Sequence, residues 1–205
     1  MQTLPDFQFE TIASEAGARR IVGVDEVGRG PLAGPVTAAA VWLDPSSLPP
    51  GLQDSKRLGP VARAAAFAQI MAASDVGIGH ASPAEIDERN ILQATYLAMH
   101  RAITALRVAP DYLLIDGNRL PPGLPCRAET IVKGDARSLS VAAASIVAKV
   151  TRDRIMTDLA QFYPGYGWEE NAGYPTKRHK NAIADLGVTP EHRRSFAPIR
   201  NMLCD

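Results

Sequence analysis

Residues 23–36, GVDEVGRGPLAGPV, decide the fold and raise the first question about function. Asp25 and Glu26 stand at the end of a short apolar run, and a Gly-Arg-Gly tripeptide follows directly. Adjacent carboxylates repel each other and lose their hydration at a cost, so a core strand has no folding reason to carry both. Something must therefore compensate this negative charge.

Length and composition predict one globular domain with a well-buried core and room for a small appended lobe. The chain has 205 residues, of which 46% are hydrophobic and 21% are charged. No apolar run reaches membrane-spanning length, and the opening MQTLPDFQFE lacks the basic start and apolar stretch of a signal peptide. Cys126 and Cys204 are far apart and support neither a disulfide framework nor a zinc cluster. We therefore expect a cytoplasmic protein that binds no membrane.

The charge of the chain is balanced in total but not along its length. The formal net charge is zero, which argues mildly against a surface coated for nucleic acid. Residues 171–200, however, carry six basic residues against two acidic ones. This segment is either an ordinary solvated helical surface or a basic region facing a polyanion.

Hydrophobic periodicity alternates between strand and helix. Strands are predicted at residues 21–27, 36–43, 75–81, 112–116 and 128–132, and helices at 60–74, 83–106 and 139–162. Ser82 and Glu85 have the spacing of a capping box at the start of the second helix. In the last helix, Ser145, Lys149 and Arg152 are predicted to share a polar stripe beside an apolar one. The alternation indicates an α/β fold with a mixed sheet.

Four acids stand at element boundaries: Asp25, Glu26, Asp116 and Asp135. Chemistry in open α/β sheets gathers beyond the strand ends, so we hypothesise that the four carboxylates meet at one edge. The alternative is that each caps a turn or pairs with a lysine. Oxygen ligands without cysteine or an HExxH histidine pair suit Mg²⁺ or Mn²⁺, and two such ions support phosphodiester hydrolysis.

The glycine-rich stretch fits neither common nucleotide motif. Gly28 and Gly34 are separated by five residues, and Pro35 stands where a P-loop needs lysine. The stretch is one residue too long for a dinucleotide fingerprint and leads into a strand instead of a helix. Two interpretations stay open: a glycine-rich hairpin connection, or a loop whose backbone approaches a sugar-phosphate while Arg29 supplies charge.

Seven motifs occur in order between residues 20 and 198 and cover most of that range. They are GVDEVGRGPLAGPV at 23–36, DSK at 54–56, LIDGN at 114–118, VKGD at 132–135, AASIVAKVTRDR at 143–154, NAGYPTKRH at 171–179 and HRRSF at 192–196. Any one motif is moderately informative, whereas the ordered set is highly specific. Together they resemble type 2 ribonuclease H, ribonuclease HII.

This resemblance implies a ribonuclease H-like fold, with a mixed five-stranded sheet flanked by helices and a helical C-terminal extension. It divides the chain into a catalytic domain at 1–160 and an extension at 161–205 that contributes to substrate binding. The implied activity is cleavage of the RNA strand in RNA–DNA hybrids. The implied enzyme also nicks 5′ of single ribonucleotides in duplex DNA, which leaves 3′-hydroxyl and 5′-phosphate ends and starts ribonucleotide excision repair.

The resemblance also assigns roles to residues. Asp25, Glu26, Asp116 and Asp135 would be the catalytic acids and would bind two divalent ions, Mg²⁺ or Mn²⁺. Backbone groups of Gly28, Arg29 and Gly30 would read the ribose 2′-hydroxyl, and Tyr174 would contact the sugar at the RNA–DNA junction. Lys56, Ser145, Lys149 and Lys177 are the candidates for contacts with backbone phosphates. In the structural alternatives, Tyr174 belongs to a surface turn, Lys56 caps a loop and Lys149 is a solvated helix residue.

Three further residues receive structural interpretations. Asp153 fits an ion pair with a neighbouring arginine better than metal binding. His179 and His192 fit structural hydrogen bonding better than catalysis.

Two rival functions stay open at this point. One is a different nuclease of the same broad fold, such as a junction resolvase or a repair exonuclease. The other is a catalytically silent nucleic-acid-binding module whose acids shape turns. We expect a monomer, and residues 197–205 contain no QxxLxxFF-like peptide that would predict a sliding-clamp partner.

Overall fold

The computed structural model describes residues 4–52, 55 and 58–204 and contains a mixed five-stranded sheet. The strands are β1 (Ile21–Val27), β2 (Val36–Trp42), β3 (Asp75–Ala81), β4 (Tyr112–Asp116) and β5 (Arg127–Ile131), in the order β3-β2-β1-β4-β5. β1, β2 and β3 are antiparallel neighbours, whereas β1, β4 and β5 are parallel. The predicted α/β class and the mixed sheet are confirmed, and β1 and β2 pair as antiparallel neighbours.

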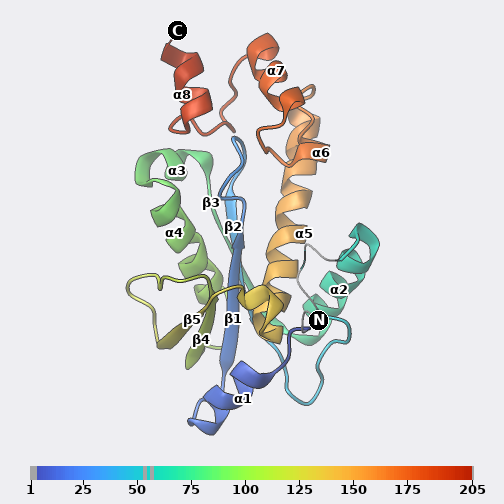
Figure 1. The fold of residues 1–205 in the computed structure, drawn as a ribbon, viewed down its shortest axis with the longest axis vertical. Coiled ribbons are helices and arrows are strands. Elements are labelled where there is room, and N and C mark those ends of the chain that lie inside the picture. Colours follow the sequence, from blue (N-terminus) through green and yellow to red (C-terminus); the bar gives the residue numbers. More distant parts are fainter. Residues whose placement is uncertain (1–3, 53–54, 56–57, 205) are drawn as a thin grey trace.

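Helices cover both faces of the sheet, and a group of short helices closes one end (Figure 1). They are α1 (Gln8–Glu15), α2 (Pro60–Ala73), α3 (Pro83–Arg89), α4 (Ile91–Thr104), the 3-10 turn η1 (Gly134–Ala136), α5 (Leu139–Phe162), α6 (Trp168–Asn171), α7 (Lys177–Leu186) and α8 (Ala197–Cys204). α3 and α4 lie on one side of the sheet and α2 and α5 on the other, while α1 lies at the end opposite α6, α7 and α8. Within the described residues, none of the helices has both the length and the apolar character to span a membrane.

The two core layers follow from the alternation of side chains along the central strands. Ala38 and Ala40 of β2 pack with α4, whereas Ala39 and Val41 face α5 and α2. A strand sends successive side chains to opposite faces, so a continuous apolar run is buried on both sides. Small alanines in β2 let both helical layers approach the sheet closely.

β1 and α5 are in close contact at Gly23. A Cβ atom at this position would lie 2.2 Å from the carbonyl carbon of Ser140, at the start of α5. Only glycine therefore permits this distance between the strand that carries Asp25 and the helix behind it.

The C-terminal segment packs on the loop that follows β1. Leu32 and Ala33 of that loop share a buried cluster with Trp168, Ile183 and Ile199. α5 continues across the predicted boundary at residue 160, so its last turns connect the two parts of the chain. The division into domains 1–160 and 161–205 stays a prediction.

The long helix predicted at 83–106 is wrong, because the structure divides it into α3 and α4 at Asn90. Asn90 has a φ of 68°, and its side-chain oxygen accepts hydrogen bonds from the N–H groups of Leu92 and Gln93. Asparagine tolerates positive φ and is a preferred N-cap, so one residue ends α3 and begins α4. The predicted capping box of Ser82 and Glu85 is confirmed at the start of α3.

We expect Gly23→Ala to destabilise the protein by about 3 kcal/mol, because the added methyl group meets backbone atoms that cannot rotate away. α5 would have to move away from β1. Urea unfolding followed by circular dichroism measures the effect. Gly59→Ala is the control, since its Cβ would meet nothing within 4 Å, and it should cost about 1 kcal/mol or less. Equal stability of the two variants would contradict this account of the β1–α5 contact.

Candidate active site

The site begins where the parallel strands β1 and β4 end side by side. Their pairing runs through Val24 and Ile115, and the next residue on each strand is Asp25 or Asp116. Asp25 is only 5% exposed. The strand register therefore brings two carboxylates that lie 91 positions apart in the sequence to one sheet edge.

β5 brings the third segment to the same edge. The N–H of Gly134 donates a 2.7 Å hydrogen bond to Oδ1 of Asp116. Lys133 adopts the left-handed conformation at a φ of 56°, which turns the chain from β5 into η1. Asp135 follows Gly134 directly and is 7% exposed. The hydrogen bond from Gly134 to Asp116 therefore brings the neighbouring residue, Asp135, to the sheet edge where the other acids lie.

Burial and like charge act together on the carboxylates. Burial raises the pKa of Asp25 well above its usual value, and the charges of Glu26 and Asp116 raise it further, against a hydrogen bond from Ser145. Burial also raises the pKa of Glu26, opposed by the Arg29 guanidinium and increased by Asp116. Asp25, Glu26 and Asp116 are thus close enough to disfavour one another's ionisation.

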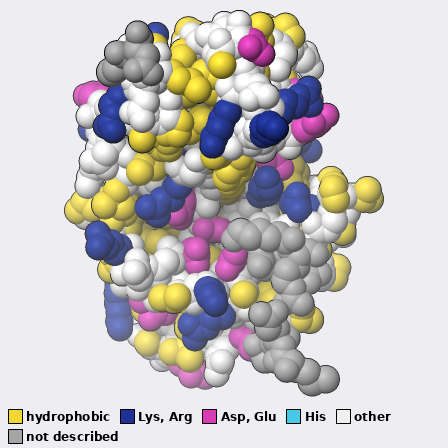
Figure 2. Space-filling model, turned by 45° about the horizontal axis from the view of Figure 1, so that its top comes forward, with side chains coloured by type: hydrophobic (Ala, Val, Ile, Leu, Met, Phe, Trp, Pro, Cys, Tyr) yellow, Lys and Arg dark blue, Asp and Glu magenta, His cyan; other side chains and the backbone are white. Residues whose placement is uncertain are grey.

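A pocket of about 320 Å³ opens beside these acids. It is lined by Glu26, Arg29, Asp116, Gly117, Asn118 and Arg119 on one side and by α4 residues Leu92, Thr95, Tyr96 and Met99 on the other. Figure 2 shows acidic side chains gathered near the middle of the face that it draws, with Lys and Arg side chains above and below them. A negatively charged centre between basic surfaces suits a polyanion held over bound cations.

The donor set fits hard divalent cations. All its side-chain donors are oxygens, and the buried Oε2 of Glu26 has no hydrogen-bond partner in the described structure. As arranged in the described residues, no group of three or more His, Cys, Asp or Glu side chains could hold a metal ion together. A cation would offset the repulsion that raises the pKa values of Asp25 and Glu26.

The loop after β1 is held from behind by two arginines that the sequence analysis missed. Arg193 donates to the carbonyls of Gly28, Arg29 and Gly34. Arg152, predicted on a polar stripe, is instead fully buried and donates to the carbonyls of Ala33, Pro35 and Ala172. Helical periodicity cannot distinguish a solvated arginine from one buried against loop carbonyls. The HRRSF motif drew attention to Arg193, but nothing in the motif itself indicates that this arginine is buried against a loop.

Tyr174 lies beside the Gly-Arg-Gly tripeptide. A Cβ at Gly30 would lie 3.7 Å from Cε1 of Tyr174. The Tyr174 side chain is 41% exposed, and the N–H of Leu32 donates to the carbonyl of Gly173 at 2.8 Å. The structure therefore brings together the tripeptide and the tyrosine, which are separated by more than 140 residues.

The four phosphate-contact candidates have different surroundings. Ser145 is buried, hydrogen-bonds the Asp25 carboxylate and lies 2.9 Å from the Ser55 hydroxyl oxygen. Lys149 donates to Asp153 at 2.7 Å, so the predicted pairing of Asp153 with an arginine is wrong. Lys177 begins α7 and lines a different pocket with Gly165 and Asp185. Lys56 lies outside the described residues.

His179 and His192 lie in the C-terminal core, 3.2 Å apart between their Nε2 atoms. Trp168 donates to His179 Nε2, and His179 Nδ1 lies 3.0 Å from the carbonyl oxygen of Tyr174. Burial lowers the pKa of both rings, that of His192 to about 4. Neutral histidines in such a network hold the backbone that precedes α7.

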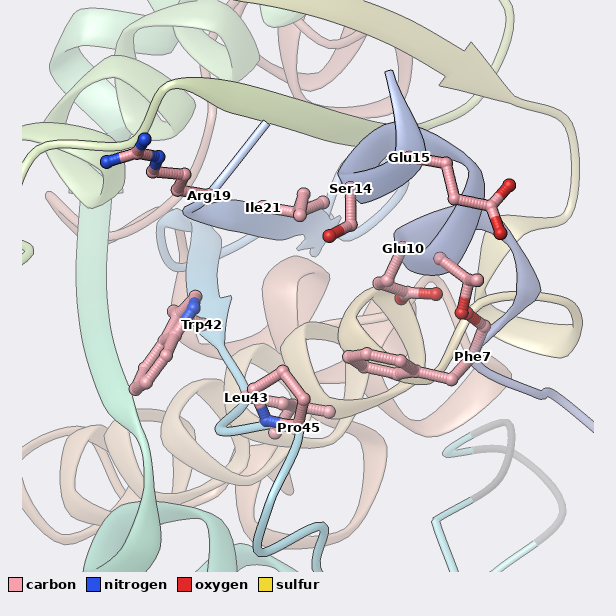
Figure 3. Close-up of a pocket in the computed structure, with 10 residues that line it drawn as sticks. Phe7, Glu10, Ser14, Glu15, Arg19, Ile21, Trp42, Leu43 and Pro45 are labelled. Carbon is pink, nitrogen blue, oxygen red and sulfur yellow. The ribbon is translucent and has the colours of Figure 1, made fainter. Parts of the chain in front are cut away.

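A separate pocket of about 230 Å³ lies at the other end of β1 (Figure 3). Its lining includes Phe7, Ile21 and Trp42 and contains none of the predicted site residues. Glu10 reaches this pocket from α1, a helix that the sequence analysis did not predict, and its Oε1 accepts from Ser138 and Ser140. These contacts anchor the start of α5, so we assign this region to structure.

Comparison with known families agrees with this geometry. A family model for ribonuclease HII matches residues 22–199. The chain belongs to the ribonuclease HII family. The ribonuclease HII of Ruegeria sp. (strain TM1040) is 61% identical over 199 residues, covering 97% of this chain and 87% of that protein.

Solved structures of the ribonuclease HII family share the fold. The ribonuclease H2 from Pyrococcus horikoshii OT3 superposes with a TM-score of 0.77 at 29% identity, covering 90% of this chain and 97% of that one. RNase HII from Archaeoglobus fulgidus, solved in a complex with PCNA, gives a TM-score of 0.72 at 27% identity and covers 85% and 94%. The chain is therefore a hydrolytic nuclease of the ribonuclease H class, which sets aside both rival functions.

We expect Asp25→Asn to raise the melting temperature in EDTA at pH 8. A carboxyl whose pKa is raised by folding destabilises the native state increasingly as the pH rises from the unfolded pKa through the raised value. Asparagine removes that charge, and each kcal/mol relieved corresponds to roughly 2–4 °C. The difference should disappear near pH 3, where both states are protonated.

Differential scanning calorimetry measures this effect with and without Mg²⁺, which should stabilise the parent more than the variant. Asp44→Asn is the control because hydrogen bonds from Ser46 lower the pKa of Asp44, so its neutralisation should not stabilise. A lower melting temperature for Asp25→Asn at pH 8 would show that the ionised Asp25 carboxylate does not destabilise the folded protein.

Proposed function

We propose that this chain cleaves the RNA strand of RNA–DNA hybrids and nicks 5′ of single ribonucleotides in duplex DNA, using two divalent ions. The nick would start ribonucleotide excision repair. One observation carries the proposal: Glu26 and Asp116, whose charges act on the buried Asp25, line a pocket together with Arg29, whose loop meets Tyr174. In this proposal, the acids that would hydrolyse the phosphodiester lie next to the loop and the tyrosine that would contact the sugar.

Asp25, Glu26, Asp116 and Asp135 would hold Mg²⁺ or Mn²⁺. Such ions, when bound, activate a water molecule and stabilise the leaving oxygen of an in-line displacement. The protein's own part is to hold the carboxylates in place, which Ser145 does for Asp25 and the Gly134 N–H does for Asp116. Arg29, whose Nη1 lies 3.2 Å from Glu26 Oε1, would exchange that carboxylate for a substrate phosphate.

Selection of RNA over DNA would depend on one hydroxyl group. The 2′-hydroxyl distinguishes the two sugars, and a site built to bond it leaves polar groups unpaired when it is missing. In our proposal, backbone groups of Gly28, Arg29 and Gly30 bond this hydroxyl while the Tyr174 ring packs on the neighbouring sugar. Recognition would then be independent of base sequence.

Phosphate contacts would supply affinity without sequence information. We propose Lys149, Lys177, Ser145 and Lys56 as these contacts; of the four, Ser145 lies beside Asp25. Residues 127–205 carry three more basic than acidic residues, and residues 1–126 the reverse. Affinity for the duplex should therefore fall as salt rises.

The proposed working form is a monomer. The PCNA in the Archaeoglobus fulgidus structure is a partner of that protein. Residues 197–205 of this chain, where we find no clamp-binding peptide, support no such partner here.

Asp116→Asn should abolish nicking of a labelled duplex with one ribonucleotide, by about a thousandfold or more, because one of the carboxylates that would hold the ions is lost. Binding of the uncut duplex should change little. A gel assay with Mg²⁺, with EDTA and with an all-DNA control duplex measures nicking, and fluorescence anisotropy measures binding. Near-normal nicking by the variant at saturating Mg²⁺ would refute the role of Asp116, and cleavage of the all-DNA duplex would refute the substrate.

Tyr174→Ala should reduce kcat/KM for the single-ribonucleotide duplex by at least about tenfold, since burying an aromatic side chain against the sugar contributes roughly 1.5–3 kcal/mol. Thermal stability should stay close to the parent because the side chain is partly exposed. Phe162→Ala is a matched control, as this aromatic residue is 78% exposed at the end of α5. If both variants nick as the parent does, Tyr174 does not contact the substrate.

A further inference from the structure

We propose that Arg193 is a specificity-positioning residue, which orients the peptide groups of the Gly28–Arg29–Gly30 tripeptide from behind so that their N–H groups face the ribose. Arg152 supports the same loop further along. This inference rests on the proposed function, in which the tripeptide reads the 2′-hydroxyl. It adds a residue that touches no substrate and acts through the loop.

The Arg193 side chain makes three hydrogen bonds to this loop. Nη2 donates to the carbonyl of Gly28 at 2.5 Å, Nη1 to that of Arg29 at 3.0 Å and Nε to that of Gly34 at 3.0 Å. The residue is fully buried, and its own N–H donates to the carbonyl of Leu32 at 2.8 Å. One guanidinium therefore fixes both ends of the loop.

Because peptide groups are planar, the contacts that Arg193 makes with the loop carbonyls also fix the direction of the loop N–H groups. The structure contains no cis peptide bond in its described part, so each C=O points opposite to the N–H of the same peptide group. The carbonyls of Gly28 and Arg29 point inward to Arg193. The N–H groups of Arg29 and Gly30 must then point outward, on residues that are themselves exposed. Two adjacent donors therefore face away from Arg193, on the outer side of the loop.

Arg152 links this loop to the segment that carries Tyr174. Its Nη1 donates to the carbonyl of Ala172 at 2.9 Å, while Nε and Nη2 donate to Pro35 and Ala33. A Cβ at Gly28 would lie 2.2 Å from Nε of Arg152, and Gly28 has a φ of 90°, so this position requires glycine for two reasons. The two arginines therefore hold the tripeptide and the segment that carries Tyr174 in fixed positions relative to each other.

The chemistry of the buried arginines favours a positioning role over simple stabilisation. Neither guanidinium has a carboxylate within ion-pair distance among the described residues, and each is surrounded by carbonyl oxygens. Burial lowers the pKa of Arg193 to about 9 and that of Arg152 to about 10, so both remain charged at neutral pH. Burying a charge is costly, and an apolar core would stabilise the fold at lower cost. The planar fork of donors holds three carbonyls in fixed directions, which a lysine ammonium cannot do.

The test compares binding selectivity in an Asp116→Asn background, where the duplex is not cut. The measured quantity is the ratio of Kd for an all-DNA duplex to Kd for the same duplex with one ribonucleotide, by anisotropy at 10 °C. Arg193→Lys should lower this ratio at least tenfold, with less than about a threefold change in Kd for the all-DNA duplex. A loss of general stability or charge would weaken both affinities together and leave the ratio unchanged.

Arg101→Lys is the matched control, because Arg101 also donates to a backbone carbonyl, that of His80, but far from the loop. It should keep the parent ratio. If circular dichroism shows that Arg193→Lys is not folded at 10 °C, the same measurement on Arg152→Lys decides whether this pair of arginines positions the tripeptide, with the same expected loss. An unchanged ratio in folded Arg193→Lys overturns the role of Arg193, and an unchanged ratio in Arg152→Lys overturns the positioning of the tripeptide by the pair. A parent ratio of one overturns the proposed 2′-hydroxyl recognition itself, so the two failures are distinguishable.

Discussion

The whole site depends on the parallel pairing of β1 with β4. This pairing ends at Val24 and Ile115 and leaves Asp25 and Asp116 at the edge, where burial and mutual repulsion raise the pKa of Asp25. Burial of apolar side chains on both faces of the sheet offsets the free-energy cost of burying these carboxylates. Under the proposed function, divalent cations would relieve this repulsion when they bind.

A second constraint acts on the loop between β1 and β2. That loop would be free to adopt many conformations, but Arg152 and Arg193 together donate hydrogen bonds to five of its carbonyls. Both arginines come from the second half of the chain. Residues far along the chain therefore hold the loop nearest the acids in its conformation.

Local patterns in the sequence predicted the elements that carry the acids. The strands at 21–27, 75–81 and 112–116 and the helix at 139–162 agree with the structure, because each has a strong period and clear ends. One error has a local cause and the other a tertiary one. Asn90 divides one predicted helix through its own backbone conformation, and α1 has a buried Glu10 whose partners, Ser138 and Ser140, lie far along the chain.

The sequence by itself determined the family, the kinds of residue available for chemistry and the places where strands end in acids, because these depend on short-range pattern and on residue type. Only the tertiary structure decided which groups meet. The strand register, the burial of Arg152 and Arg193 against loop carbonyls and the position of Tyr174 beside Gly30 all join segments far apart in the chain. Such contacts arise from packing of whole elements, and no local periodicity contains that information.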